Sequence, residues 1–174
     1  ESLDPAIRLA AAGPVFTAAA VRRERGQAPI APDADLSQSA DFLKMITGKV
    51  PGEAEARALD AYLVTVCDHG LNASKRANRE AVTGFGHRVY RVRDPRADAL
   101  KAAVARLPGT SGRISFADHI EKTVLGRLAK KYPNRTLETN VEFSTALLLE
   151  ALAIPREAFT ATFACGRILG WPRA

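Results

Sequence analysis

The stretch that decides the fold is residues 84–96, which read Gly-Phe-Gly-His-Arg-Val-Tyr-Arg-Val-Arg-Asp-Pro-Arg. Its end is a helix start, because Asp94 suits the N-cap and Pro95 suits the first helical position, where a missing N–H costs nothing. Residues 88–92 are the only run in the chain with strand character. The stretch therefore predicts a glycine-rich turn that leads into a helix continuing toward Leu107.

Helical periodicity dominates on both sides of this stretch. Leu59, Leu63 and Val66 share one face of a predicted helix, and Gly48 has the position of a helix C-cap. Pro155 separates the last two predicted helices. The fold class that follows is all-α. The predicted helices are one around Leu9, one ending at Gly48, 53–67, 95–107, one from Ile114 up to Pro133, 137–153 and 156–171.

The composition is typical of a globular protein. The 174 residues are 47% hydrophobic and 25% charged, which suffices for one domain or two small lobes. We find no secretory signal pattern and no run near ~18 apolar residues, so we expect a cytoplasmic protein without a membrane span. Cys67 and Cys165 lie in apolar helical contexts and are expected to be reduced structural thiols. No cluster has metal-ligand spacing, so no metal is expected.

The net charge of +6 comes from 25 basic and 19 acidic residues. Most of these charges are expected to lie on a solvated surface, and a sharper interpretation is steering of polyanionic small molecules toward a basic cleft. Nucleic acid is the least favoured partner, because aromatic residues make up only 6% of the chain and no basic helix alternates with stacking rings.

The three histidines have different sequence settings. His87 lies between a glycine and an arginine in a turn, which suggests backbone close to a ligand and an imidazole directed at it. His69 follows a helix, and His119 lies on a polar helix face and is expected to be a surface residue. Taken alone, His69 or His87 would more often be a loop residue than a catalytic one.

Four further charged residues are informative. Arg96 lies in the first turn of a helix, where a bound anion would explain a positive charge. Arg167 is the only charge in the apolar run 163–171 and needs an anionic partner, either a structural carboxylate or a ligand. Glu142 alone is a helix-surface residue, but its apolar neighbours leave open a partly buried base. Arg93 is expected to be solvated. The residues alone thus predict a helical protein with an anion pocket rich in His and Arg.

Six segments, in the same order along the chain, resemble the citrate synthase family. Residues 84–90 together with 94–96 are the most specific part of the match, which covers nearly the whole chain. The resemblance implies an all-α fold of two domains with the active site in the cleft, a large domain of residues 1–74 and 160–174 and a small domain of 75–159. The six segments are 41–43 (DFL), 68–74 (DHGLNAS), 84–90 (GFGHRVY), 94–96 (DPR), 140–143 (NVEF) and 163–171 (FACGRILGW).

The resemblance also implies roles for individual residues. His69, Arg96 and Arg167 would hold an oxaloacetate-like substrate, and His87 would bind it and polarise its ketone carbonyl. Glu142 stands where most family members have an aspartate base that removes a methyl proton from the acyl-CoA. The positions where relatives contact CoA are Gly84, Gly86, Arg91 and Asn140.

The implied reaction is condensation of acetyl-CoA with oxaloacetate to citrate and CoA, by enolisation, attack on the ketone and thioester hydrolysis. The enzyme would be an acyltransferase of the tricarboxylic acid cycle and a homodimer, with CoA entering as cosubstrate and no permanently bound cofactor. The alternative is 2-methylcitrate synthase, which uses propionyl-CoA. One extra methylene in an apolar pocket changes the binding free energy by only ~1–3 kcal/mol, and no residue of this sequence decides between the two acyl-CoA substrates.

One departure from the family follows residues 72–74 (Asn-Ala-Ser). There the family continues with a long helical stretch ending in a run similar to G-P-L-H-G-G-A, whose histidine stabilises the enol, whereas here residues 75–80 follow at once. After Trp171, relatives continue with a helix and an arginine that reaches the neighbouring subunit's site. Either the polypeptide is longer than this sequence, or the protein lacks these segments and only binds a dicarboxylate or CoA. Loss of core helices would cost more than a typical stability of ~5–15 kcal/mol, which favours the longer polypeptide.

Overall fold

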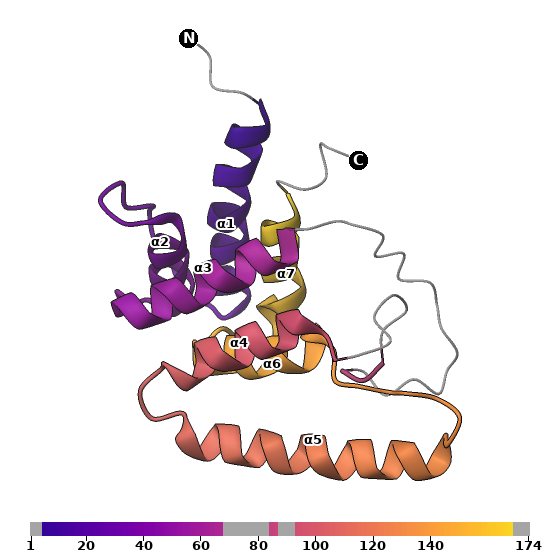
Figure 1. Ribbon diagram of the computed structural model, residues 1–174. Helices are drawn as coiled ribbons and strands as arrows, with labels where there is room; N and C mark the ends of the chain where they lie inside the picture. The colour runs from indigo at the N-terminus through magenta and orange to yellow at the C-terminus, as the bar shows by residue number, and fades with distance from the viewer. Residues whose placement is uncertain (1–4, 68–83, 87–92, 169–174) are drawn as a thin grey trace. The chain divides into compact units, whose positions relative to one another are not determined.

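The structure, a computed structural model, describes residues 5–67, 84–86 and 93–168 (Figure 1). The described residues are mostly helical, and within them the only β-type pairing is an isolated antiparallel bridge between Phe85 and Thr139. The all-α prediction is confirmed. The strand-like run 88–92 lies outside the described residues. The elements are α1 (Pro5–Glu24), α2 (Gln38–Thr47), α3 (Glu53–Cys67), α4 (Pro95–Ala105), α5 (Ser111–Lys131), α6 (Val141–Ala151), the 3-10 helix η1 (Arg156–Ala158) and α7 (Phe159–Arg167).

The chain divides into two compact units. The first consists of Glu1–Asn72 and Leu152–Ala174, and the second of Ala73–Ala151. The first unit contains α1, α2, α3, η1 and α7, and the second contains α4, α5 and α6. The naming of a large and a small domain, with boundaries at 74 and 160, stays a prediction.

Helix ends predicted from local sequence are confirmed. Gly48 ends α2 in the left-handed region at φ 81°, and its N–H donates to the carbonyl oxygen of Lys44 at 2.9 Å. A residue with a Cβ is strained at this φ, so glycine is favoured here. Asp94 caps α4, accepting a hydrogen bond from the backbone N–H of Arg96, and Pro95 is the first helical residue. Both ends are determined by residues within one turn of the cap.

The start of the sixth helix differs from the prediction. We expected a helix from about 137, but α6 begins at Val141. The residues just before it are extended, because Gly86 N–H donates to the Glu138 carbonyl oxygen and Asn140 N–H donates to the Gly84 carbonyl oxygen. This pairing joins segments more than 50 residues apart and has no local sequence signal.

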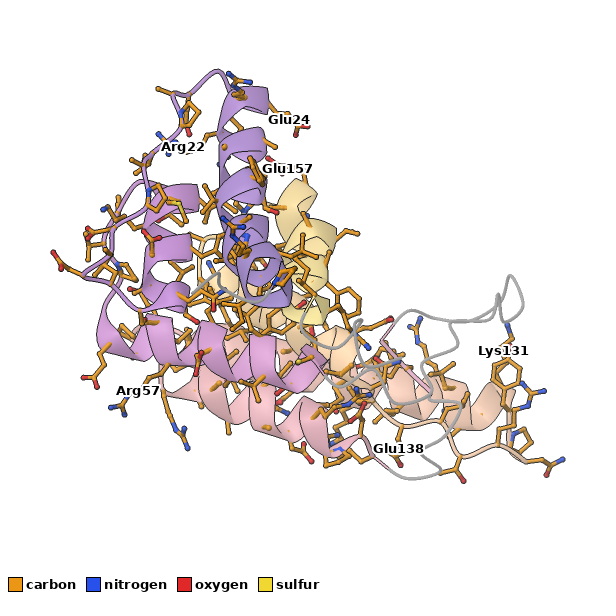
Figure 2. All side chains as sticks on the ribbon, turned by 90° about the horizontal axis from the view of Figure 1, so that it is seen from above. Arg22, Glu24, Arg57, Lys131, Glu138 and Glu157 are labelled. Carbon is orange, nitrogen blue, oxygen red and sulfur yellow. The ribbon has the colours of Figure 1, made fainter. Side chains whose placement is uncertain are left out.

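The core of the first unit lies between α1, α2, α3 and α7. Phe42 and Ile46 of α2 and Leu59 and Tyr62 of α3 are fully buried there. Charged side chains such as Arg57 point outward from the helices (Figure 2). This is the usual separation of apolar and polar faces on amphipathic helices.

Gly166 marks the closest approach of two helices in this core. A Cβ at Gly166 would collide with Cγ2 of Val66 and come within 3.2 Å of the Leu63 carbonyl oxygen. Only glycine therefore lets α7 pack this closely against α3.

Gly166→Ala is expected to lower the free energy of unfolding by about 1–3 kcal/mol, because overpacking forces the two helices apart. The matched control is Gly126→Ala on α5, where a Cβ would meet nothing within 4 Å. This control should stabilise by roughly 0.5–1 kcal/mol through helix propensity. Urea unfolding followed by circular dichroism measures both. Equal effects of the two substitutions would refute the close approach.

In the second unit, α4 and α6 pack against each other. Leu100 and Val104 of α4 and Leu148 and Leu149 of α6 are buried at this contact. Among the described residues, no helix is both long and apolar enough to cross a membrane.

Candidate active site

The predicted site residues fall into three groups. Gly84, Gly86, Arg96, Asn140 and Glu142 are described and belong to the second unit. Arg167 is described and belongs to the first unit. The remaining three, His69, His87 and Arg91, lie outside the described residues.

Gly84 and Gly86 form one side of the short pairing with residues 138–140. Both have positive φ, 93° and 83°, a region that favours glycine. A Cβ on Gly84 would come within 3.1 Å of the Phe143 Cβ, and one on Gly86 within 3.1 Å of Leu137 Cδ2. Gly84 therefore lets the backbone approach the first turn of α6 closely, and Gly86 lets it approach Leu137, which precedes α6.

Asn140 joins this glycine segment to α6. Its side-chain Nδ2 donates to the Gly86 carbonyl oxygen at 2.9 Å, and its Oδ1 accepts from the backbone N–H of Glu142 at 2.9 Å. The second contact is that of a helix N-cap. Asn140 thus holds Gly86 and Glu142 in a defined mutual position. Its predicted contact with CoA stays a prediction.

Glu142 lies in the first turn of α6 and its side chain is exposed. Of the two positions that the sequence leaves open, a helix-surface residue and a partly buried base, the structure shows the first. The apolar neighbour Phe143 instead turns toward Phe85, with ring centroids 5.5 Å apart. A carboxylate in a first helical turn is stabilised by the helix dipole, and here it is accessible to a substrate.

Arg96 is paired with Asp94, which is only 1% exposed. The guanidinium Nε and Nη2 donate to the two Asp94 carboxylate oxygens at 3.0 and 2.9 Å. The same carboxylate accepts from the backbone N–H of Val141 at 3.3 Å and so connects the starts of α4 and α6. The anion that we expected beside Arg96 is thus supplied, at least in part, by Asp94. Burial alone raises the pKa of Asp94, but the Arg96 side chain and backbone N–H together hold that pKa below its usual range.

Arg93 and Glu121 form a second charged cluster. Glu121 of α5 is 6% exposed and accepts hydrogen bonds from Arg93, from Thr139 Oγ1 at 2.5 Å and from Lys101 Nζ at 3.1 Å. Burial raises the pKa of Glu121, but the hydrogen bonds from Arg93, Thr139 and Lys101 lower it by more. The pKa of Glu121 is therefore below that of an ordinary glutamate. The expectation that Arg93 is solvated is wrong, because it bridges Glu121 and Asp98.

Thr139 connects the Glu121 cluster to the candidate site. Thr139 is buried, forms the antiparallel β-bridge with Phe85 and is followed directly by Asn140. The signal that sequence reasoning missed is that Glu121 lies four residues after Ala117 and seven before Leu128, on the buried stripe of α5.

Arg167 is buried in the last turn of α7. Its guanidinium carbon lies 4.8 Å from the centroid of the Phe163 ring. Burial raises the pKa of the nearby Tyr62 hydroxyl, and the positive charge of Arg167 opposes that rise. Among the described residues, no group hydrogen-bonds the Tyr62 hydroxyl. The substrate role of Arg167 stays a prediction.

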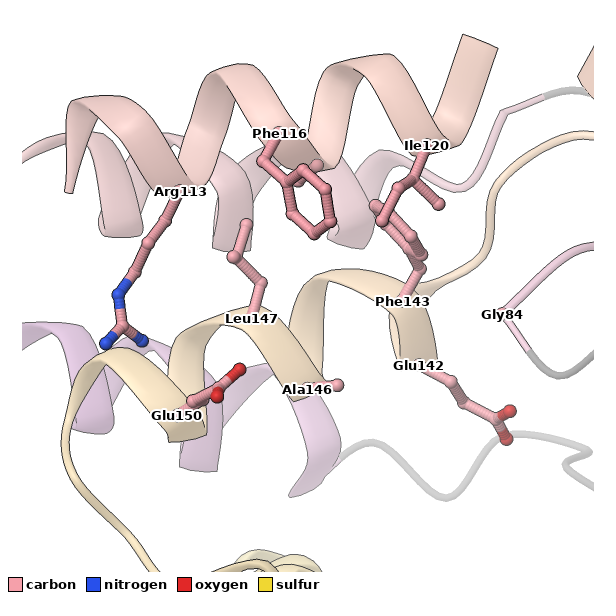
Figure 3. Close-up of a pocket in the computed structure, with 10 residues that line it drawn as sticks. Gly84, Arg113, Phe116, Ile120, Glu142, Phe143, Ala146, Leu147 and Glu150 are labelled. Carbon is pink, nitrogen blue, oxygen red and sulfur yellow. The ribbon is translucent and has the colours of Figure 1, made fainter. Parts of the chain in front are cut away.

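A groove of about 430 Å³ lies in the second unit between α5 and α6 (Figure 3). Glu142 and Gly84 are at its edge, and its walls are mostly apolar. Among the described residues, no group of His, Cys, Asp and Glu has the arrangement of a metal site. The residues that line the groove are Gly84, Arg113, Phe116, Ala117, Ile120, Glu142, Phe143, Ala146, Leu147 and Glu150.

Comparison with known proteins identifies the family. The family model described as "Citrate synthase, C-terminal domain" matches residues 1–79 and 75–172. The chain therefore belongs to the citrate synthase family.

Individual relatives agree with this assignment. The chain is 30% identical to a citrate synthase of Deinococcus radiodurans over 225 positions, covering 94% of this chain and 58% of the relative. It is 44% identical to "Putative citrate synthase 2" of Mycobacterium tuberculosis over 92 residues, covering 53% of this chain and 24% of that protein. The chain thus spans less than two thirds of these relatives.

A solved structure with the same fold is the citrate synthase of Thermoplasma acidophilum in ternary complex with carboxymethyl coenzyme A and oxaloacetate. The TM-score is 0.80 at 17% identity, over 95% of this chain and 59% of that chain. At this identity the likeness shows the fold alone.

Proposed function

We propose that this protein catalyses the citrate synthase reaction, in which acetyl-CoA, oxaloacetate and water give citrate and CoA. The observation that carries the proposal is the placement of Glu142, exposed in the first turn of α6 and held beside the glycine segment by Asn140. The family match over residues 1–79 and 75–172 supports a condensing enzyme, and we propose that its reaction is an acyl transfer in which the acyl group becomes an alkyl group.

In the proposed mechanism, Glu142 removes a proton from the methyl group of acetyl-CoA. The resulting enol carbon attacks the ketone carbon of oxaloacetate, forming a carbon–carbon bond, while His87 donates a hydrogen bond to the ketone oxygen as it takes up negative charge. Water then cleaves the thioester of citryl-CoA, which releases CoA and the new carboxylate. His69, Arg96 and Arg167 would bind the carboxylates of oxaloacetate, since forked guanidinium donors match carboxylate oxygens.

CoA enters this mechanism as a cosubstrate. Gly84, Gly86, Arg91 and Asn140 are the proposed contacts, and the first two and Asn140 are joined by hydrogen bonds into one segment beside Glu142. The solved structure of the Thermoplasma acidophilum citrate synthase is a ternary complex with carboxymethyl coenzyme A and oxaloacetate, which supports this choice of ligands. A cytoplasmic homodimer acting in the tricarboxylic acid cycle completes the proposal.

A second candidate is a protein that binds oxaloacetate or CoA without turnover. The alignment to the Deinococcus radiodurans relative spans 225 positions but contains only about 164 residues of this chain, which is 94% of 174. Roughly 60 positions of the relative therefore have no counterpart here, and their absence favours this second candidate. The family segment expected there carries a further catalytic histidine.

Thiol release from acetyl-CoA and from propionyl-CoA, each with and without oxaloacetate, separates these possibilities. We expect oxaloacetate-dependent release with a preference for acetyl-CoA. A preference for propionyl-CoA would instead indicate 2-methylcitrate synthase. Calorimetric binding of oxaloacetate with no thiol release from either substrate would establish the binding-only function.

A further inference from the structure

Thr139 is held both by its backbone and by its side chain. Its backbone forms the antiparallel bridge to Phe85, and its hydroxyl donates to a carboxylate oxygen of Glu121 at 2.5 Å. Thr139 is only 1% exposed, and Glu121 is buried as well. A hydrogen bond to an ionised carboxylate is about twice as strong as one between neutral groups. The position of Thr139 is therefore determined by α5 as well as by residues 84–86.

The Glu121 carboxylate is itself fixed by two cations. Arg93 donates to the same oxygen as Thr139, and Lys101 donates to the other oxygen at 3.1 Å. Arg93 directly precedes the N-cap of α4, and Lys101 lies within that helix. Because both carboxylate oxygens are bonded, the side chain has little freedom to rotate. Glu121 thus offers Thr139 an acceptor at a fixed place.

The anchoring of Thr139 directs the residue that follows it. Successive side chains of an extended segment point to opposite sides. Thr139 contacts α5, whereas the Asn140 side chain donates to the Gly86 carbonyl oxygen and accepts from the Glu142 N–H, both at 2.9 Å. A rotation of the backbone at Thr139 would break both contacts of Asn140. Glu142 extends from the first turn of α6, at the same end of the helix as Gly84 (Figure 3).

We propose that Thr139 and Glu121 are positioning residues for Glu142. The bond from hydroxyl to carboxylate fixes Thr139, Thr139 directs Asn140, and the Asn140 cap sets the place of the first turn of α6. Their role rests on the proposed function, in which Glu142 is the base. A general base must lie within hydrogen-bond reach of the proton that it removes, and a displacement of about 1 Å can cost ~10²-fold in rate.

Thr110 provides a matched control for Thr139. It is a second buried threonine of the same unit, and its hydroxyl donates to the carbonyl oxygens of Val104 and Leu107, each at 2.8 Å. These bonds lie at the connection between α4 and α5. Valine at either position keeps the shape of threonine and removes the hydroxyl. Comparing the two variants therefore separates the loss of a buried hydrogen bond from the loss of positioning.

Amide hydrogen exchange of the full chain, followed by NMR, measures the positioning without turnover. The reporters are the three backbone N–H groups whose hydrogen bonds join residues 84–86 to the start of α6, those of Gly86, Asn140 and Glu142. We expect Thr139→Val to raise their exchange rates at least about tenfold, and Thr139→Ser and Thr110→Val to keep them within about threefold of the wild type. Wild-type exchange rates in Thr139→Val would overturn the proposal.

Oxaloacetate-dependent CoA release is the second readout. Thr139→Val should lower kcat by about 10–100-fold, with the KM for oxaloacetate within about twofold, because the Thr139 hydroxyl donates to Glu121 and not to a proposed oxaloacetate ligand. Thr139→Ser should restore kcat, and Thr110→Val should keep it. Equal losses of kcat in Thr139→Val and Thr110→Val would overturn the positioning role, because a general loss of stability would then explain both.

The two readouts separate this proposal from the proposed function. A wild-type chain without CoA release would contradict the proposed function, and the exchange rates would still decide whether Thr139 positions the segment. Glu121→Gln tests the same bond from the acceptor side and replaces Thr139→Val where circular dichroism shows that this variant does not fold. Its neutral amide oxygen is a weaker acceptor, so the three reporters should again exchange faster, by about threefold or more. Wild-type exchange rates in Glu121→Gln would also overturn the proposal.

Discussion

Glu142→Gln is expected to lower the rate of oxaloacetate-dependent CoA release from acetyl-CoA by about 10²–10⁴-fold, the usual contribution of a general base. The amide of glutamine keeps the size of the side chain and cannot accept the methyl proton. Because Glu142 is exposed and Asn140 holds its backbone rather than its side chain, the fold should be unaffected. The rate is measured by thiol detection at saturating substrates.

The matched control is Glu138→Gln, four residues earlier. The backbone oxygen of Glu138 accepts a bond from Gly86, so a side-chain amide leaves that contact in place. The control should retain activity within a few fold. Equal losses in both variants, or full activity of Glu142→Gln, would remove Glu142 from the role of base.

Glu121→Ala is expected to lower the free energy of unfolding by about 3 kcal/mol. The substitution leaves the cations of Arg93 and Lys101 and the buried hydroxyl of Thr139 without the carboxylate that accepts from them. This cost is at the low end of the values found when a buried ion pair is broken, because the side chains of Arg93 and Lys101 are partly exposed to water.

Asp118→Ala serves as the control, since Asp118 lies on the same helix and pairs with the same Lys101 but is half exposed. Its cost should stay below about 1 kcal/mol, as for other surface ion pairs. Denaturant unfolding of both variants measures the difference. If Asp118→Ala costs as much as Glu121→Ala, burial of the Glu121 carboxylate does not determine the stability of this unit.

The same carboxylates predict how stability depends on pH. Folding lowers the pKa of Glu121 from its ordinary 4.5 and that of Asp94 from 3.8, so the unfolded chain binds more protons in this range. Their contribution is fully present above pH 4.5 and is lost as the pH falls through the lowered values. The free energy of unfolding should therefore drop in acid, and less steeply in Glu121→Ala. Parallel acid profiles for wild type and variant would contradict the lowered pKa of Glu121.

The features predicted correctly from sequence are those encoded locally. The Asp94–Pro95 helix start and the Gly48 helix end depend on residues within one turn, and the structure shows both. Arg167, the only charge in the apolar run 163–171, is buried in the structure, and the anionic partner predicted for it stays a prediction. Such signals need no knowledge of what lies across the fold.

The features that were missed depend on partners distant in sequence. Arg93 was assigned to solvent because its partner Glu121 lies 28 residues away on another helix. The start of α6 was placed too early because residues 138–140 pair with 84–86, a contact without local periodicity. Between the surface and the partly buried positions that the sequence leaves open for Glu142, local periodicity does not decide, and the structure shows the exposed one.

Mass spectrometry of the products formed from acetyl-CoA and oxaloacetate tests the account most directly. We predict that the purified chain forms citrate and CoA in equal amounts, and that neither appears when oxaloacetate is omitted. A folded chain that binds oxaloacetate by calorimetry yet yields no citrate would contradict the assignment of Glu142 and His87 to a condensation reaction.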